Sequence, residues 1–164
     1  MNNNLLEIVK SQFKPDINGD HGVSHWKRVE KTGLYLAKET KADKEVVKLF
    51  ALLHDSQREN EDKDPEHGLR AAKFAQELYE QKKLSVSKHQ LRLLITACKK
   101  HSNPHAKSGS ITVQTCWDSD RLDLFRLNIQ PDPFYLFTGI AKMPESINFA
   151  QSLFINGGKP MSNV

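Results

Sequence analysis

The chain has 164 residues, of which 38% are hydrophobic and 27% charged, and its formal net charge is +4. This is the size and composition of one soluble globular domain, and no apolar run approaches the roughly 20 residues that span a bilayer. The positive charge comes from scattered lysines without interleaved aromatic residues, which permits contact with phosphates but argues against sequence-specific nucleic-acid binding.

The pattern of apolar residues predicts an all-α fold, because period-2 alternation of β-branched residues never persists long enough to indicate a strand. Helical spacing predicts helices at about 3–13, 22–40, 43–56, 66–82, 87–101, 111–127 and 144–154. Signals for N-caps or first turns stand at Asp43, Asp64-Pro65, Ser87 and Ser110. We predict one compact domain over 1–164 with six to eight helices, comprising a motif core at about 20–127 and a C-terminal packing segment at 128–164.

The cysteines and the first residues bear on the cellular location. Cys98 and Cys116 both lie in apolar helical patterns and are expected to be reduced core residues. The opening stretch MNNNLLEIVK lacks the basic and then apolar regions of a secretory signal. We therefore expect a cytoplasmic protein with no membrane partner, whereas the sequence leaves its oligomeric state open.

Four histidines continue the apolar faces of four predicted helices, because positions three, four and seven apart share a face. They are His25, His54, His67 and His101, in the helices predicted at 22–40, 43–56, 66–82 and 87–101. Each stands at or near an end of its helix, where a core can open into a pocket. We expect the four side chains to point toward one cavity.

Two aspartates accompany these histidines. Asp55 follows His54 directly, where an apolar helix meets a polar loop, and Asp120 occupies the centre of the apolar face of the helix at 111–127. A buried carboxylate is costly unless a strong partner compensates its charge. Asp118 and Asp123 are predicted to project away from that face, although Asp118 shares a second, partly apolar side of the helix.

Together, these six side chains predict a metal site. Neutral imidazole and carboxylate suit a divalent cation (Mn²⁺, Fe²⁺, Co²⁺, Ni²⁺, Zn²⁺ or Mg²⁺), and the lack of closely spaced cysteines argues against a structural zinc site. A single histidine on an apolar face is more often a hydrogen-bonded core residue, and a histidine at a helix end can satisfy a free carbonyl. The combination of all six side chains favours a metal site over separate hydrogen-bonded core residues.

The residues resemble the HD-domain superfamily of metal-dependent phosphohydrolases, in which a His, then His-Asp, then a distant Asp come from different helices. The matching stretches are HGVSHWKRV, LLHD and DSDRLD. The resemblance implies an HD-type helical fold, with His25, His54, Asp55 and Asp120 as the metal ligands. It also implies that Arg58, three places after the His-Asp pair, assists phosphate chemistry.

Some members of this superfamily bind two metals through extra histidines, and His67 and His101 stand in the corresponding interval. One cation is expected and a second is left open. Otherwise these two histidines would contact phosphate, transfer a proton or support the ligands. The predicted catalytic residues are Asp55, Arg58, His67 and His101.

Other charged residues are expected to be peripheral. His21 and His105 are expected at the surface or at the rim of the pocket. Weaker phosphate-binding candidates, which are more often ordinary surface cations, are Lys99, Lys100, Lys107 and Arg121.

The resemblance implies hydrolysis of a phosphoester or phosphoanhydride by a metal-activated water, with a nucleotide or another small phosphorylated metabolite as substrate. Asp55 would accept a proton, and Arg58 would offset phosphoryl charge. Two alternatives are a di-iron HD-type oxygenase and a non-catalytic metal-containing domain that binds a nucleotide or a partner protein. A third is a structural bundle with buried His-Asp hydrogen bonds, whose melting temperature would not respond to chelators.

Overall fold

The computed structural model describes residues 3–157, and in that range it contains seven α-helices, two short 3-10 helices and no strand. The elements are α1 (Asn3–Gln12), α2 (Val23–Thr40), α3 (Lys44–Leu53), α4 (His67–Glu80), α5 (Lys88–Lys100), α6 (Ile111–Arg121), η1 (Leu124–Leu127), η2 (Pro133–Tyr135) and α7 (Pro144–Asn156). The all-α prediction is confirmed. The end of the predicted C-terminal segment, 158–164, lies outside the described residues. Within the described range, no helix combines the length and apolar character needed to cross a membrane.

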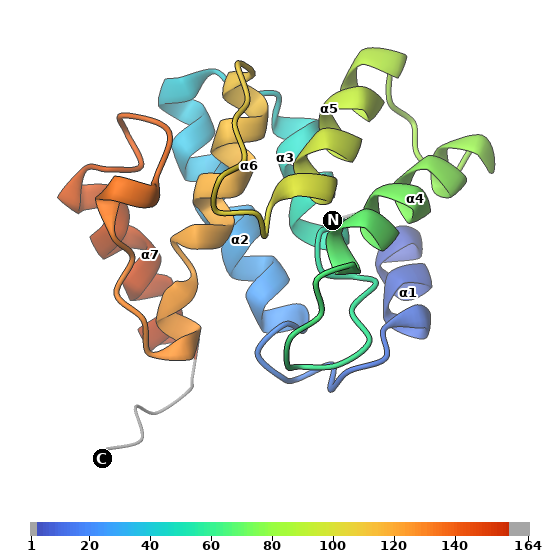
Figure 1. Cartoon of the computed structure of the whole chain (residues 1–164), viewed down its shortest axis with the longest axis horizontal. Helices are drawn as coiled ribbons and strands as arrows, with labels where there is room; N and C mark the ends of the chain where they lie inside the picture. Colours follow the sequence, from blue (N-terminus) through green and yellow to red (C-terminus); the bar gives the residue numbers. More distant parts are fainter. Residues whose placement is uncertain (1–2, 158–164) are drawn as a thin grey trace.

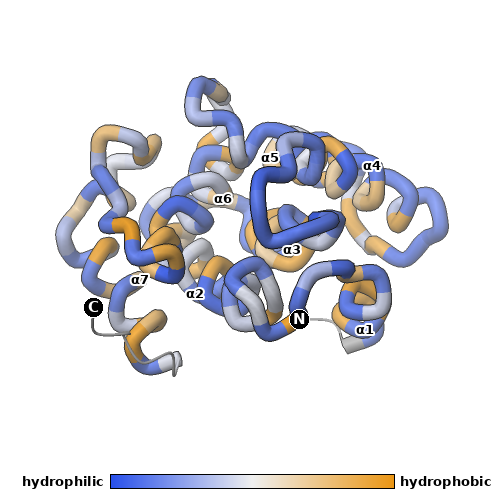
Figure 2. The backbone as a smooth tube through the Cα atoms, turned by 60° about the horizontal axis from the view of Figure 1, so that its bottom comes forward, coloured by the Kyte–Doolittle hydropathy of each residue, from blue (hydrophilic) through white to orange (hydrophobic). Residues whose placement is uncertain are grey.

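Helix α3 lies at the centre of the fold and contacts α1, α2, α5 and α6 (Figure 1). Nearly every residue from Val46 to Leu53 is buried, and Figure 2 shows α3 as hydrophobic over much of its length. A helix that is covered on several sides must be apolar around most of its circumference. The LFALL run therefore determines the central position of α3 and brings the His54-Asp55 pair that follows it into the interior.

The N-cap predictions at Asp43, Ser87 and Ser110 are confirmed. The prediction at Asp64 is wrong, because Glu66 precedes α4 and makes no side-chain cap. The Asp64 carboxylate instead accepts hydrogen bonds from the backbone N–H of Glu59 and from the Arg70 guanidinium. Asp64 therefore ties the loop between α3 and α4 to the first turns of α4.

The helix predicted at 111–127 ends earlier than expected. Helix α6 stops at Arg121, and the 3-10 helix η1 then carries the chain from Leu124 to Leu127. Asp123 lies beyond the end of α6 and no longer follows the helical period, so its side chain turns inward. The prediction that Asp123 projects away from the site is therefore wrong, whereas Asp118 lies on the second, partly apolar side expected for it, and both are buried. Asp118 is covered because the chain after η2 packs against that side of α6.

Asp118 fastens the C-terminal part of the chain to α6. Its Oδ1 accepts the backbone N–H of Phe137 at 2.7 Å, and its Oδ2 accepts the backbone N–H and the hydroxyl of Thr138 at 2.8 and 2.7 Å. Burial raises the pKa of Asp118 above its ordinary value, although these donors act in the opposite direction. From this anchor the chain continues into α7, which packs along α2 (Figure 1).

We expect Asp118→Ala to lower the free energy of unfolding by about 3 kcal/mol, because it removes three hydrogen bonds and leaves two backbone N–H groups without their acceptor. Chemical denaturation measures this loss. The matched control is Asp132→Ala, since the exposed Asp132 caps η2 by accepting only the N–H of Phe134, and we expect about 1 kcal/mol there. Equal losses in the two variants would contradict an anchoring role for Asp118.

Candidate metal centre

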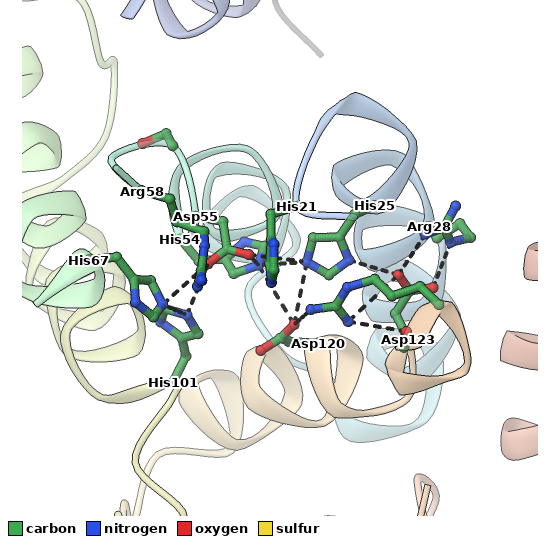
Figure 3. Close-up of polar contacts among 12 residues, drawn as sticks. His21, His25, Arg28, His54, Asp55, Arg58, His67, His101, Asp120 and Asp123 are labelled. Carbon is green, nitrogen blue, oxygen red and sulfur yellow. Dashed lines mark hydrogen bonds and ion pairs between the residues drawn. The ribbon is translucent and has the colours of Figure 1, made fainter. Parts of the chain in front are cut away.

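Four histidines from four helices meet between the helix ends. His25 lies in the first turn of α2, His54 follows the last residue of α3, His67 begins α4, and His101 follows the last residue of α5. All four are at most 5% exposed, and Figure 3 shows their rings gathered around one space. The predicted convergence of these side chains on one site is thus present in the structure.

The imidazoles are oriented through hydrogen bonds from Nδ1. His54 Nδ1 donates to the carbonyl oxygen of Phe50 at 3.1 Å. His101 Nδ1 donates to that of Cys98 at 2.7 Å, and His67 makes the same kind of bond to a carbonyl three residues earlier. A carbonyl oxygen only accepts, so each of these rings has a hydrogen on Nδ1, and Nε2 is the nitrogen that it turns toward the cluster and offers to a cation when the ring is neutral.

The Nε2 atoms form two close pairs. Nε2 of His25 is 3.0 Å from Nε2 of His54, and Nε2 of His67 is 2.8 Å from Nε2 of His101. Two lone pairs at such distances repel each other unless a proton or a cation lies between them. Two ligands at right angles, each about 2.1 Å from one cation, lie about 3 Å apart. The spacing of these nitrogens therefore fits a divalent cation at each pair.

Asp55 lies between the two pairs (Figure 3). Its Oδ2 is 3.6 Å from Nε2 of His25 and 3.5 Å from Nε2 of His54. Its Oδ1 is 3.2 Å from Nε2 of His67 and 3.4 Å from Nε2 of His101. Burial acts to raise the pKa of Asp55, but the His54 charge and hydrogen bonds from the other three imidazoles hold it well below its ordinary value. One ionised carboxylate thus presents one oxygen to each pair.

Asp120 adds a carboxylate to the pair of His25 and His54. Its Oδ1 is 3.5 and 3.7 Å from their Nε2 atoms, and these three residues could together hold a metal ion. Although burial opposes ionisation, a hydrogen bond from His54 and the charges of His54 and Arg126 hold the pKa of Asp120 far below its usual range. The Asp120 side chain is 15% exposed, so it lies at the edge of the cluster rather than at the centre of an apolar face.

Asp123 is absent from the predicted site residues, yet it positions His25. Its Oδ2 accepts the Nδ1 hydrogen of His25 at 2.7 Å, and Arg28 donates to the same carboxylate at 2.6 and 2.9 Å. Burial raises the pKa of Asp123, but His25 and Arg28 outweigh this effect and lower it. The sequence contains a pattern from which this role of Asp123 could have been predicted. His25 and Arg28 share a face of α2, and Asp123 stands three residues after Asp120.

We expect Asp123→Asn to weaken divalent-metal binding about 10- to 100-fold, because a carboxylate behind a ligating histidine fixes its ring and increases the basicity of Nε2. Titration calorimetry of chelator-treated protein with Mn²⁺ measures this change. Asp132→Asn is the matched control at an exposed position and should bind Mn²⁺ as the wild type does. An unchanged affinity in Asp123→Asn would mean that the His25 ring is held without this carboxylate.

Each carboxylate of the cluster has a guanidinium nearby. Arg28 lies 2.6 Å from Asp123, Arg58 lies 3.9 Å from Asp55, and Arg126 lies 4.0 Å from Asp120 and 3.9 Å from Asp123. The carbonyls of Asn60 and Asp62 hold Arg58 in place, so this predicted phosphate-binding residue does lie beside the cluster. Three negative charges are therefore balanced by three positive ones before any cation binds. Divalent cations would make the centre positive and favour an anionic ligand.

Two cavities open onto the cluster. The first, which we name the α6 cavity, has a volume of about 350 Å³ and is lined by His101, Ser102, Pro104, Asp120, Arg121, Leu124, Arg126 and Tyr135. The second, the loop cavity, measures about 480 Å³ and is lined by Arg58, Asp62, Lys63, Asp64, Pro65, His67, Ser102, Asn103 and Pro104. Both volumes are in the range of small-molecule sites. Ser102 and Pro104 line both cavities, which therefore lie side by side at the cluster.

The remaining histidines, lysines and cysteines that the sequence analysis named lie outside the ligand cluster. His21 is buried at the rim, where its Nδ1 is 2.5 Å from a Glu61 carboxylate oxygen and its ring centroid is 6.3 Å from that of His25. His105 and the lysines Lys99, Lys100 and Lys107 are exposed. Cys98 and Cys116 are buried and unpaired, as expected of reduced core residues.

Comparison with known proteins supports the fold. No family model and no curated protein matches the chain. It is similar to the crystal structure of a predicted HD superfamily hydrolase from an uncultured Thermotogales bacterium, with a TM-score of 0.67 and 24% sequence identity over 93% of this chain and 86% of that one. Identity at this level shows the fold alone. The chain thus has the fold of this predicted HD superfamily hydrolase, and its buried histidines and aspartates fit a divalent-metal site.

Proposed function

We propose that the protein is a metal-dependent phosphohydrolase with two divalent cations, which cleaves a phosphoester or phosphoanhydride of a small substrate such as a nucleotide. The observation that carries this proposal is the position of Asp55, whose two oxygens face separate pairs of histidine Nε2 atoms. Dinuclear centres of this kind act on phosphoryl groups in many hydrolases. The likeness in fold to a predicted HD superfamily hydrolase supports the same reaction class.

The proposed ligand set uses all six predicted residues. His25, His54 and Asp120 would hold one cation, His67 and His101 would hold the other, and Asp55 would be shared between them. This set assigns His67 and His101 to metal binding rather than to proton transfer, and it makes two cations our proposal where the sequence leads us to expect one. When bound, divalent cations polarise a phosphoryl oxygen and lower the pKa of a coordinated water.

The protein groups supply charge and orientation. Arg58 has its Nη1 3.9 Å from Asp55 Oδ1, and its other nitrogens are fixed by loop carbonyls, so its guanidinium is placed to pair with phosphoryl oxygens and offset their charge. Asp55 has both oxygens turned toward the histidine pairs and a pKa held well below its ordinary value, so this ligand set assigns it to cation binding rather than to its predicted role as proton acceptor. The buried histidines exclude bulk water from the base of the site.

Metal analysis followed by hydrolysis assays tests the proposal. Protein purified without added metal is analysed for metal content and then assayed with Mn²⁺, Co²⁺ or Mg²⁺. The substrates are p-nitrophenyl phosphate, bis(p-nitrophenyl) phosphate, inorganic pyrophosphate and a panel of nucleotides. Metal-dependent hydrolysis that disappears in Asp55→Ala supports a phosphohydrolase. Two irons with oxygen consumption and no hydrolysis would instead support the di-iron oxygenase, for which the second histidine pair also suffices. Metal binding without turnover would support a non-catalytic domain.

A further inference from the structure

Arg126 is an arginine with a buried side chain beside the proposed metal centre, near Asp120, whereas Arg58 lies near Asp55. The Arg126 side chain is 6% exposed, and its Nη2 is 4.0 Å from Asp120 Oδ1, the oxygen that faces His25 and His54. Its Nη1 donates to the backbone carbonyl of Asp123 at 3.1 Å. Arg126 belongs to η1 and reaches this place because α6 ends before it.

The hydrogen-bonding capacity of Arg126 is not used up by the protein. Among the described residues, its Nε has no hydrogen-bond partner, and the same is true of Nη1 of Arg121. A buried donor without an acceptor is destabilising, so such groups need an explanation in a native structure. Both guanidiniums line the α6 cavity, and Arg121 is fixed there over the Phe137 ring at 4.9 Å. The cavity is thus lined by two guanidiniums, and each of them contains one buried N–H donor that no acceptor in the described part of the chain uses.

Cation binding would remove the charge of one of the two carboxylates that now face Arg126. Its Nη1 is 3.9 Å from Oδ2 of Asp123, an oxygen that His25 and Arg28 already contact, whereas its Nη2 is 4.0 Å from Oδ1 of Asp120. A divalent cation held by His25, His54 and Asp120 would take up the charge of that carboxylate. The guanidinium would then have excess positive charge in the wall of the α6 cavity, where an anionic group of the ligand can pair with it.

Guanidiniums consequently stand on two sides of the cluster. Arg58 lies beside Asp55 and lines the loop cavity, whereas Arg126 lies beside Asp120 and lines the α6 cavity. A phosphomonoester offers one phosphoryl group, which Arg58 and the cations suffice to bind. A ligand with a second phosphate directly bonded to the first can fill the other side as well.

We propose that Arg126 is a phosphate-binding residue that makes the site selective for phosphoanhydrides, with the phosphate under attack at the cluster and the adjoining phosphate in the α6 cavity. This inference rests on the proposed phosphohydrolase function. In the reaction, a water oxygen bonds to the first phosphorus and loses its proton to the surrounding solvent, while the bond from that phosphorus to the bridging oxygen breaks. The bridging oxygen and its electron pair leave with the second phosphate, whose charge Arg126 offsets.

Direct binding of methylenediphosphonate, a non-hydrolysable diphosphate analogue, tests the inference without turnover. Titration calorimetry is done at a fixed saturating concentration of Mn²⁺ in both solutions, and orthophosphate is the comparison ligand. We expect Arg126→Gln to weaken methylenediphosphonate binding about 30-fold and orthophosphate binding about 3-fold. The ratio of kcat/KM for pyrophosphate to kcat/KM for p-nitrophenyl phosphate should fall about 10-fold. Arg92→Gln, at an exposed arginine of α5, is the matched control and should change neither quantity.

A second variant covers the case in which Arg126→Gln does not fold. Arg126→Lys keeps the charge but loses the paired N–H groups, and we expect it to weaken methylenediphosphonate binding about 5-fold with little change for orthophosphate. Equal effects on the two ligands in the folded variants would overturn the role of Arg126 and leave the proposed hydrolase intact. If the wild type binds no metal and hydrolyses no substrate, the proposed function itself fails.

Discussion

Asp55→Asn is expected to reduce kcat by about a thousandfold or more and to lower metal occupancy, while the helical fold persists. Asparagine keeps the shape of the side chain but lacks the negative charge that faces all four Nε2 atoms. Its amide nitrogen would also present hydrogen atoms to one histidine pair. Loss of a ligand shared by two cations removes charge stabilisation from the whole reaction centre, which is why the effect should exceed that of other single substitutions.

Turnover of the best substrate at saturating Mn²⁺ measures this effect, and circular dichroism shows whether the helices remain. The matched control is Asp132→Asn, which makes the same chemical change at an exposed position and should retain wild-type kcat. If Asp55→Asn kept more than about a tenth of wild-type turnover, Asp55 would not be the shared ligand, and the dinuclear proposal would fail with it.

Divalent cations are expected to raise the melting temperature by about 10–20 °C, with two Mn²⁺ bound per chain. Free ligand at 100 times Kd stabilises the native state by about 2.7 kcal/mol per site. For a chain of this length, 1 kcal/mol shifts the melting temperature by about 2–4 °C. A chelator should reverse the shift. The structural bundle considered as an alternative would show no shift, because its buried histidines would be satisfied by hydrogen bonds alone.

The variant His101→Ala distinguishes a centre with one metal ion from a centre with two. It removes one partner of the His67–His101 pair, so we expect one Mn²⁺ per chain and about half of the thermal shift. His105→Ala is the control, because His105 is an exposed histidine four residues away. One Mn²⁺ in both the wild type and His101→Ala would reduce the centre to a single metal site and return His101 to a role in proton transfer or phosphate contact.

Much of the fold follows from short-range patterns. Apolar residues at helical spacing locate the helices, and side chains such as Asp43 and Ser87 cap them through bonds to N–H groups two or three residues away. The orientation of His54 and His101 is also local, because each donates from Nδ1 to a carbonyl in the preceding turn of its own helix. These interactions depend on neighbours along the chain, so the amino-acid sequence is sufficient to anticipate them.

Asp123 and Arg126 show where local patterns fail. An uninterrupted helix over 111–127 would turn Asp123 away from the core, but α6 ends at Arg121. No glycine or proline marks that end in the sequence. The change of direction coincides with the bonds that Asp123 forms to His25 and Arg28, almost 100 residues earlier in the chain. Contacts between such distant residues can outweigh helical propensity, which amounts to less than about 1 kcal/mol per residue.

The sequence by itself determined that this protein is helical and that four histidines and two aspartates lie on or beside buried helix faces, because periodicity and burial follow from local hydrophobicity. Only the tertiary structure decided that Asp55 lies between two histidine pairs, that Asp123 orients His25, and that Arg126 lines a cavity beside Asp120. These relations depend on how the ends of α2, α3, α4 and α5 converge and on where α6 stops. Both are set by packing between segments far apart in the chain.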